Sequence, residues 1–164
     1  MKKVLVIFIL TSIISCITSN RYIYAAAPYV YFRGRHYLEG GVGKYGYGTR
    51  YYWISSKFSG YLYNCAKDAM LDWSKNSKMI DFKYASKKSE SVLNMYCIND
   101  GEDSGINAYT IHKRGVLSFV NPDEKNWKYG QIYYNLDNGL STSNLKDRKK
   151  IISVFAYEIV IALV

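Results

Sequence analysis

The sequence predicts an α+β domain in which a β-sheet carries helices on one of its sides. Several short segments alternate apolar and polar residues and are rich in tyrosine, as half-buried strands are. Two other segments have the apolar spacing or continuity of helices that pack on a core. The order strand, strand, helix, several strands and helix favours α+β over a regular α/β alternation.

Length and composition are those of one globular domain. The 164 residues leave room for a single core. Hydrophobic residues make up 49% of the chain and charged residues 21%, a balance that excludes wholesale disorder. With two prolines and no tandem repeat, the chain is neither collagen-like nor a solenoid.

The N-terminus has the layout of a secretory signal peptide. Lys2 and Lys3 precede an unbroken apolar run over 4–14, and small residues follow at 25–27. We therefore expect residues 1–25 to be a signal peptide and residues 26–164 to be the exported domain. The alternatives are a buried N-terminal strand and a lipid anchor at Cys16, which the atypical Ile13 of its lipobox-like stretch disfavours.

The charge of the exported chain points to anionic partners. Removal of the leader takes away Lys2, Lys3 and Arg21, so the formal charge falls from +9 to +6. A basic exported protein is expected to adhere to anionic cell-wall polymers or lipid headgroups. Nucleic acid is not an expected partner outside the cell, and no transmembrane helix is expected.

The apolar periodicity of the exported chain predicts several strands and, between the strands at 50–55 and 80–84, a helix. We expect strands at 29–37, 50–55, 80–84, 91–98, 108–111 and 131–135, with a further candidate at 115–120. A helix is expected from Gly60 to Ser74, with Leu62, Ala66, Ala69, Met70 and Trp73 on its core face.

Two loops contain residue types found in ligand-binding loops, but neither matches the sequence motif that such a site requires. The glycine-rich loop 40–48 has Leu38 and Tyr45 where a phosphate-binding P-loop needs Gly and Ser or Thr. The acidic loop 99–105 could offer oxygen ligands to calcium, but it lacks the spacing of an EF-hand. A turn and a solvated loop are the interpretations that these segments favour.

The C-terminal segment predicts a buried helix that contains one carboxylate. Asn144 is placed to cap its start, with Asp147 in the first turn. The run from Ile151 to Val164 is interrupted only by Ser153, Tyr157 and Glu158, and it is too short to span a bilayer. A carboxylate in such a run is costly unless it is paired, protonated or open to a cleft, so Glu158 needs a partner.

The segment Val154-Phe155-Ala156-Tyr157-Glu158-Ile159-Val160-Ile161-Ala162-Leu163-Val164 resembles the active-site helix of matrixin-type zinc metallopeptidases, a group within the metzincins. That family reads V-x-A-H-E-x-G-H-x-L-G. The order of the upstream strands and helix is also similar to the family's catalytic domain. The resemblance implies a zincin-like upper subdomain: a twisted, mixed β-sheet of about five strands packed on two helices. It also implies hydrolysis of peptide or protein substrates by zinc-bound water.

The residues that this chemistry needs are replaced. Two histidines one helical turn apart hold zinc in the family, and the intervening glutamate is the general base. Here Tyr157 and Ile161 occupy the histidine positions, and only Glu158 matches. His36 and His112 are the only histidines of the chain. We therefore expect no bound zinc, no catalysis, and a degenerate homologue that is truncated before the family's third histidine and C-terminal subdomain.

The cysteines leave one question open. Without the leader, Cys65 and Cys97 remain, and an exported protein could pair them in a disulfide or bury them as thiols. Neither belongs to a C-x-x-C motif, which excludes a zinc finger of that type.

A second hypothesis is a non-enzymatic exported binding protein. Aromatic and basic residues are interleaved near the start of the exported chain and could form a surface for wall glycan or protein. The residues are Tyr29, Tyr31, Arg33, Arg35, Tyr37, Lys44, Tyr45, Tyr47, Arg50, Tyr51, Tyr52 and Trp53. The alternative is that they are ordinary strand residues, half exposed because tyrosine is amphipathic.

Overall fold

The computed structural model describes residues 36–40, 50–76, 82–100, 105–137 and 145–163, apart from the side chains of 145 and 146. All of them belong to one unit of the chain, Phe32–Val164. Over these described ranges the unit is an α+β domain with a five-stranded mixed sheet and two long helices, the fold class that the sequence predicts. Of the expected features, the signal peptide, Cys16, strand residues 29–35, the glycine loop beyond Gly40 and loop residues 101–104 lie outside the described residues.

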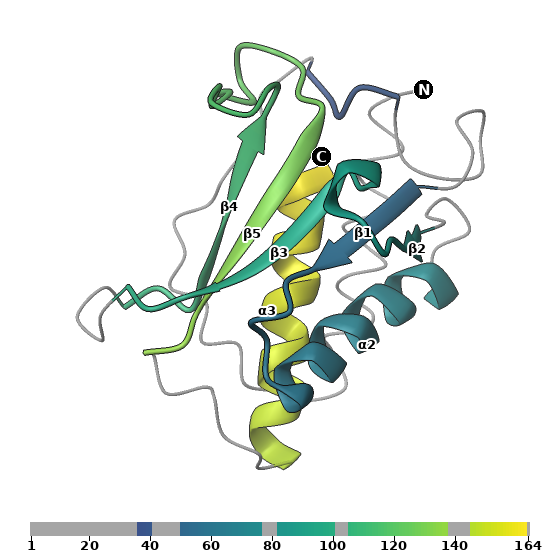
Figure 1. Ribbon diagram of the computed structural model, residues 1–164. Helices are drawn as coiled ribbons and strands as arrows, with labels where there is room; N and C mark the ends of the chain where they lie inside the picture. The colour runs from purple at the N-terminus through teal and green to yellow at the C-terminus, as the bar shows by residue number, and fades with distance from the viewer. Residues whose placement is uncertain (1–35, 41–49, 77–81, 101–104, 138–144, 164) are drawn as a thin grey trace. The chain divides into compact units, whose positions relative to one another are not determined.

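Four strands of the sheet run parallel and one edge strand runs against them. The strands are β1 (Arg50–Ile54), β2 (Phe82–Tyr84), β3 (Leu93–Ile98), β4 (Ala108–Lys113) and β5 (Tyr129–Asn135). Their spatial order is β2-β1-β3-β5-β4, and only β4 is antiparallel to its neighbour, β5 (Figure 1). The mixed sheet therefore ends on one side in an antiparallel pair.

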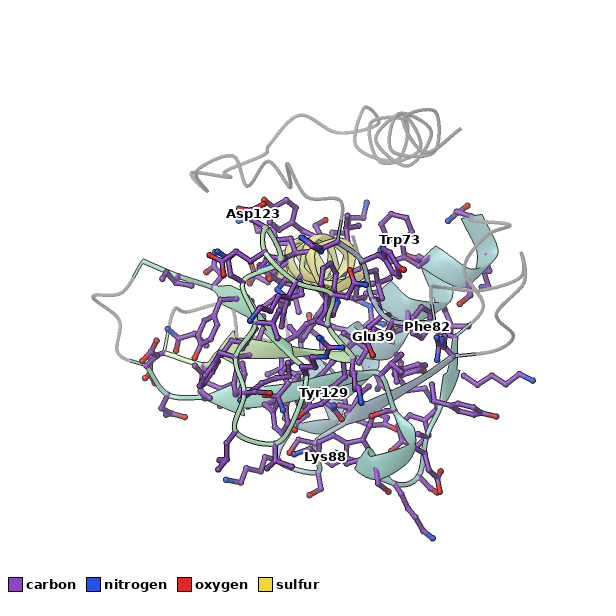
Figure 2. The ribbon with its side chains drawn as sticks, turned by 90° about the horizontal axis from the view of Figure 1, so that it is seen from above. Glu39, Trp73, Phe82, Lys88, Asp123 and Tyr129 are labelled. Carbon is purple, nitrogen blue, oxygen red and sulfur yellow. The ribbon has the colours of Figure 1, made fainter. Side chains whose placement is uncertain are left out.

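Both long helices cover the same face of this sheet. They are α2 (Gly60–Asn76) and α3 (Leu145–Leu163), and a short 3-10 turn, η1 (Lys88–Glu90), precedes β3. Figure 2 shows the two helices together on one side of the strands and Lys88 on the other. The Ser59 side chain accepts a hydrogen bond from the Leu62 N–H (3.3 Å), which caps the start of α2.

The core lies between the helices and the strand residues that alternate toward them. These are Tyr52 and Ile54 of β1, Leu93 and Met95 of β3, and Ile132 and Tyr134 of β5, all buried. The expected face of α2 meets them, with Leu62, Ala66, Ala69 and Met70 buried and Trp73 half-buried. The period-2 pattern of the strands and the helical stripe thus produce one continuous core.

The two helices are fastened to each other by polar contacts as well. The guanidinium of Arg148 on α3 forms an ion pair with Asp68 on α2. The Trp73 indole N–H donates a hydrogen bond to the Ala156 carbonyl (3.1 Å). An indole at this position therefore packs against the partner helix with its apolar ring and satisfies its polar atom there.

The strand candidate at 115–120 is wrong. Its only sheet-like contact is a single bridge between Lys113 and Phe119, because the chain turns at Gly115 and folds back on the end of β4. The expected turn at 121–124 is confirmed.

Cys65 and Cys97 are free thiols, and burial raises the pKa of Cys97 to about 12. This thiol therefore stays protonated at neutral pH.

Within the described residues, no helix combines the length and the apolar character that a bilayer span requires.

Substituting Gly130 should test the close contact between β5 and α3. A Cβ added at Gly130 would lie 2.7 Å from the Ala162 Cβ, so Gly130→Ala must push the helix away from the strand. We expect a loss of about 1–3 kcal/mol in the free energy of unfolding, measured by urea denaturation. Gly60→Ala is the control, because an added Cβ there meets no atom within 4 Å. Equal stability of Gly130→Ala and the wild type would contradict the contact.

Candidate functional site on the last helix

Helix α3 carries the three residues that the sequence singles out, Tyr157, Glu158 and Ile161. It begins at Leu145 and has Asp147 in its first turn, while the expected cap Asn144 lies outside the described residues. The helix packs against α2, β5 and the edge strand β4. The sequence predicts that this helix is buried on all sides. That prediction is wrong for one side, where Ser153 and Tyr157 are exposed. The sheet covers only one side of a helix, and α2 covers a second.

Glu158 finds its partner on β4. Its side chain is only 6% exposed, and Oε2 accepts a hydrogen bond from the Thr110 hydroxyl at 2.7 Å. The same hydroxyl oxygen lies 3.2 Å from the Glu158 carbonyl. Burial raises the pKa of Glu158, and the hydrogen bond from Thr110 opposes this shift in part. The carboxyl group is therefore engaged in the contact between helix and strand.

Tyr157 and Ile161 do not provide zinc ligands. Tyr157 is 45% exposed and Ile161 is half-buried, one helical turn further along α3. Burial, and to a lesser extent the charge of Glu158, raises the pKa of Tyr157, so its phenol is protonated at neutral pH. A neutral phenol is a poor ligand and an alkyl side chain is none. The donor set on α3 does not fit zinc.

The remaining residues that could coordinate a metal ion are scattered over the described part of the chain. Over the ranges that the structure describes, no group of three or more His, Cys, Asp or Glu side chains could hold a metal ion. His36 lies at the start of the first described segment, and His112 lies in β4. The His112 ring contacts the C-terminal end of α3.

His112 and Trp127 close the C-terminal turn of α3. The His112 Nε2–H donates to the Ile161 carbonyl at 2.9 Å, and the Trp127 indole N–H donates to the Ala162 carbonyl at 2.9 Å. The two rings pack edge to face, with centroids 4.5 Å apart. Burial lowers the pKa of His112, which the bond to Ile161 opposes, so the ring is neutral at pH 7. These donors satisfy carbonyls that the end of a helix leaves without partners.

The sequence did not reveal this arrangement, although a signal was present. Thr110 and His112 are two residues apart in one strand, so both point toward the helices. Their partners, Glu158 and Ile161, are three residues apart on α3 and share a face. Only the pairing of β4 with β5 brings this strand over the helix, and the pairing is not visible in the local pattern.

The opposite face of the sheet carries a row of aromatic rings. Trp53, Tyr96, Tyr133 and Tyr109 lie on β1, β3, β5 and β4, with successive ring centroids 5.7, 5.1 and 5.2 Å apart. The last two contacts are nearly parallel stacks. The Lys88 ammonium lies 5.1 Å from the centre of the Tyr96 ring. We call these four residues the aromatic row.

The aromatic row only partly coincides with the surface that the sequence suggested. Trp53 belongs to both, Tyr37 and Tyr51 are exposed, and Tyr52 is buried in the core. The suggested residues 29–35 and 44–47 lie outside the described part of the chain. Tyr96, Tyr109 and Tyr133 were missed because they come from separate strands, and only the sheet register aligns them.

Comparison with known proteins adds no relative to these observations. Neither protein-family models nor curated proteins match the sequence.

Replacing the Glu158 carboxyl should change how stability depends on pH. Because the folded-state pKa is raised, the stability that this group contributes is complete below its unfolded value of 4.5 and is lost as pH rises through the folded-state pKa. Glu158→Gln cannot titrate and retains an oxygen that accepts the Thr110 hydrogen bond. We expect the variant to lose less stability than the wild type as pH rises, measured by urea denaturation from about pH 4 to about pH 8.

The comparison of the two proteins isolates Glu158, because His112 titrates in both. Glu90→Gln, at an exposed carboxylate on η1, controls for the loss of one negative charge. Parallel pH profiles for Glu158→Gln and the wild type would show that burial does not perturb this carboxyl.

Proposed function

We propose that the protein is a secreted homologue of matrixin-like zinc metalloendopeptidases that does not hydrolyse peptides. The observation that carries the proposal is the setting of Glu158. Its helix is one of two that pack on a five-stranded mixed sheet, and positions 157 and 161 lie one turn apart beside it. This is the arrangement that the resemblance implies for the zinc-binding helix and its general base.

The side chains on that helix support the non-catalytic part of the proposal. Tyr157 and Ile161 offer no zinc ligand at neutral pH, so no metal-bound water stands beside Glu158 to be deprotonated. Glu158 itself is turned to Thr110 on β4 and has a raised pKa. Its role in this protein is to hold the helix against the edge strand.

The test of this proposal is a paired measurement of metal and activity. We expect the purified protein, supplied with zinc, to retain no stoichiometric metal after gel filtration and to show no chelator-sensitive hydrolysis of casein. The double variant Tyr157→His with Ile161→His places two imidazoles one turn apart and should gain zinc binding, measured by competition with a chromophoric chelator.

The single variant Tyr157→His is the matched control, because one imidazole should bind zinc much more weakly than two. Chelator-sensitive hydrolysis by the wild type would contradict the non-catalytic proposal. Failure of the double variant to bind more zinc than the single variant would contradict the placing of positions 157 and 161 on a common accessible face.

A second candidate function is non-enzymatic binding of cell-wall glycan, and the aromatic row favours it. Four rings from four strands form a nearly continuous apolar strip on the face opposite the helices. Tyr96, Tyr133 and Tyr109 cover one another's faces, so their ring edges and hydroxyls are the parts left for contact with a sugar, and the adjacent Lys88 adds positive charge. The ring hydroxyls are also held in place, since Tyr133 donates to Gln131 (3.1 Å) and Gln131 donates to Tyr96 (3.3 Å).

Wall binding can be separated from simple charge attraction by salt. We expect Tyr96→Ala and Tyr133→Ala each to weaken sedimentation with isolated cell wall about fivefold, an effect that persists at high salt because contacts with uncharged rings are not screened. Tyr157→Ala, at an exposed tyrosine on α3, should bind as the wild type does. Binding that disappears for all proteins on addition of modest salt would rule out a glycan site on the aromatic row.

A further inference from the structure

The connection between β4 and β5 exposes more apolar surface than any other part of the described chain. Val116 is 85% exposed, Leu117 90% and Phe119 70%, whereas the other large apolar side chains of the described residues are at most half exposed. Figure 1 shows the chain passing the head of β4 and curling beyond the sheet before it returns into β5. Such exposure means that almost no protein atoms surround these side chains, so the tip projects outward.

The projecting tip is held in one conformation by hydrogen bonds at its base. The Ser118 and Arg114 N–H groups donate to the carbonyls of Gly115 (3.4 Å) and Ser118 (3.3 Å). The Tyr129 hydroxyl donates to the same Gly115 carbonyl at 2.9 Å. Below the tip, the Val120 N–H donates to His112 in β4 at 2.9 Å. These hydrogen bonds reduce the cost of ordering the backbone of the tip on binding.

The charged groups lie around the base and not on the tip. The Lys113 ammonium lies 3.7 Å from the centre of the Phe119 ring and donates to the Val116 carbonyl at 3.4 Å. Arg114 forms an ion pair with Glu39 (2.9 Å). The following turn exposes Lys125 and Lys128 together with Asp123 and Glu124. Residues 115–122 carry no charge, and the whole chain has a formal charge of +9.

We propose that this connection, residues 113–120, docks the protein on an anionic lipid surface. A convex tip of two almost fully exposed aliphatic side chains cannot be covered by a flat rigid surface, whereas a fluid acyl layer closes around it. Phe119, whose ring contacts the buried Lys113 ammonium, would lie at the headgroup level. Val116 and Leu117 enter the acyl boundary, and the basic chain favours anionic over zwitterionic headgroups.

Vesicle sedimentation tests the proposal directly. We expect the wild type to bind vesicles that contain phosphatidylglycerol more tightly than vesicles of phosphatidylcholine alone. The double variant Val116→Ser with Leu117→Ser should bind the anionic vesicles at least about tenfold more weakly. All proteins carry the same N-terminus, so that segment cannot produce a difference between them.

The matched control is Leu71→Ser with Ile106→Ser, which removes two apolar side chains that are exposed elsewhere. It should bind vesicles as the wild type does, and thermal melting checks that each variant is folded. Equal binding of the tip variant and the wild type would overturn the proposal. Self-association of the wild type that the tip variant abolishes in the absence of lipid would also overturn it, because a second copy would then cover the tip.

A second measurement does not depend on losing a contact. The tryptophan fluorescence of the Leu117→Trp variant should be quenched by brominated anionic lipid more strongly than that of the wild type, because the added indole enters the acyl boundary. Quenching no stronger than that of the wild type would show that the tip stays in water.

Discussion

The contact between α3 and the antiparallel edge of the sheet is the constraint on which the rest of the structure depends. An apolar helix packs there on β5, and Gly130 allows it to approach the strand closely. Its polar groups cannot reach bulk water on that side, so each needs a partner within the protein. Trp73, His112 and Trp127 supply donors to the carbonyls of Ala156, Ile161 and Ala162, and the Thr110 hydroxyl donates to the Glu158 carboxyl group.

This constraint also decides what the candidate site can do. Glu158 and His112 are titratable groups of the kind used in catalysis, but both are engaged in the contact between α3 and β4. Burial disfavours the charged form of each, raising the pKa of the acid and lowering that of the base. Their effects on stability therefore have opposite signs: alkaline conditions weaken the contribution of Glu158, and acidic conditions weaken that of His112.

Strand β4 gives the sheet two different surfaces. Thr110 and His112 face α3, while Tyr109 faces the other way and completes the aromatic row. The same strand continues into the exposed tip at 113–120. The antiparallel pairing with β5 sets the direction of β4, and this direction determines where the aromatic row and the tip lie.

The sequence alone determined the fold class and most elements. The strands at 50–55 and 91–98 and the helix from Gly60 are recognisable because their periodicity is local, and burial on one face follows directly from it. The sequence also showed that Glu158 requires a partner, because the cost of burying a carboxylate does not depend on the fold.

Only the tertiary structure decided which partners these residues have. Thr110 reaches Glu158, and His112 and Trp127 reach the end of α3, because β4 turns back antiparallel beside β5. The aromatic row likewise depends on the register of four strands that are distant in sequence. Periodicity indicates which side of an element is buried, but pairing between distant strands is set by the packing of the whole domain.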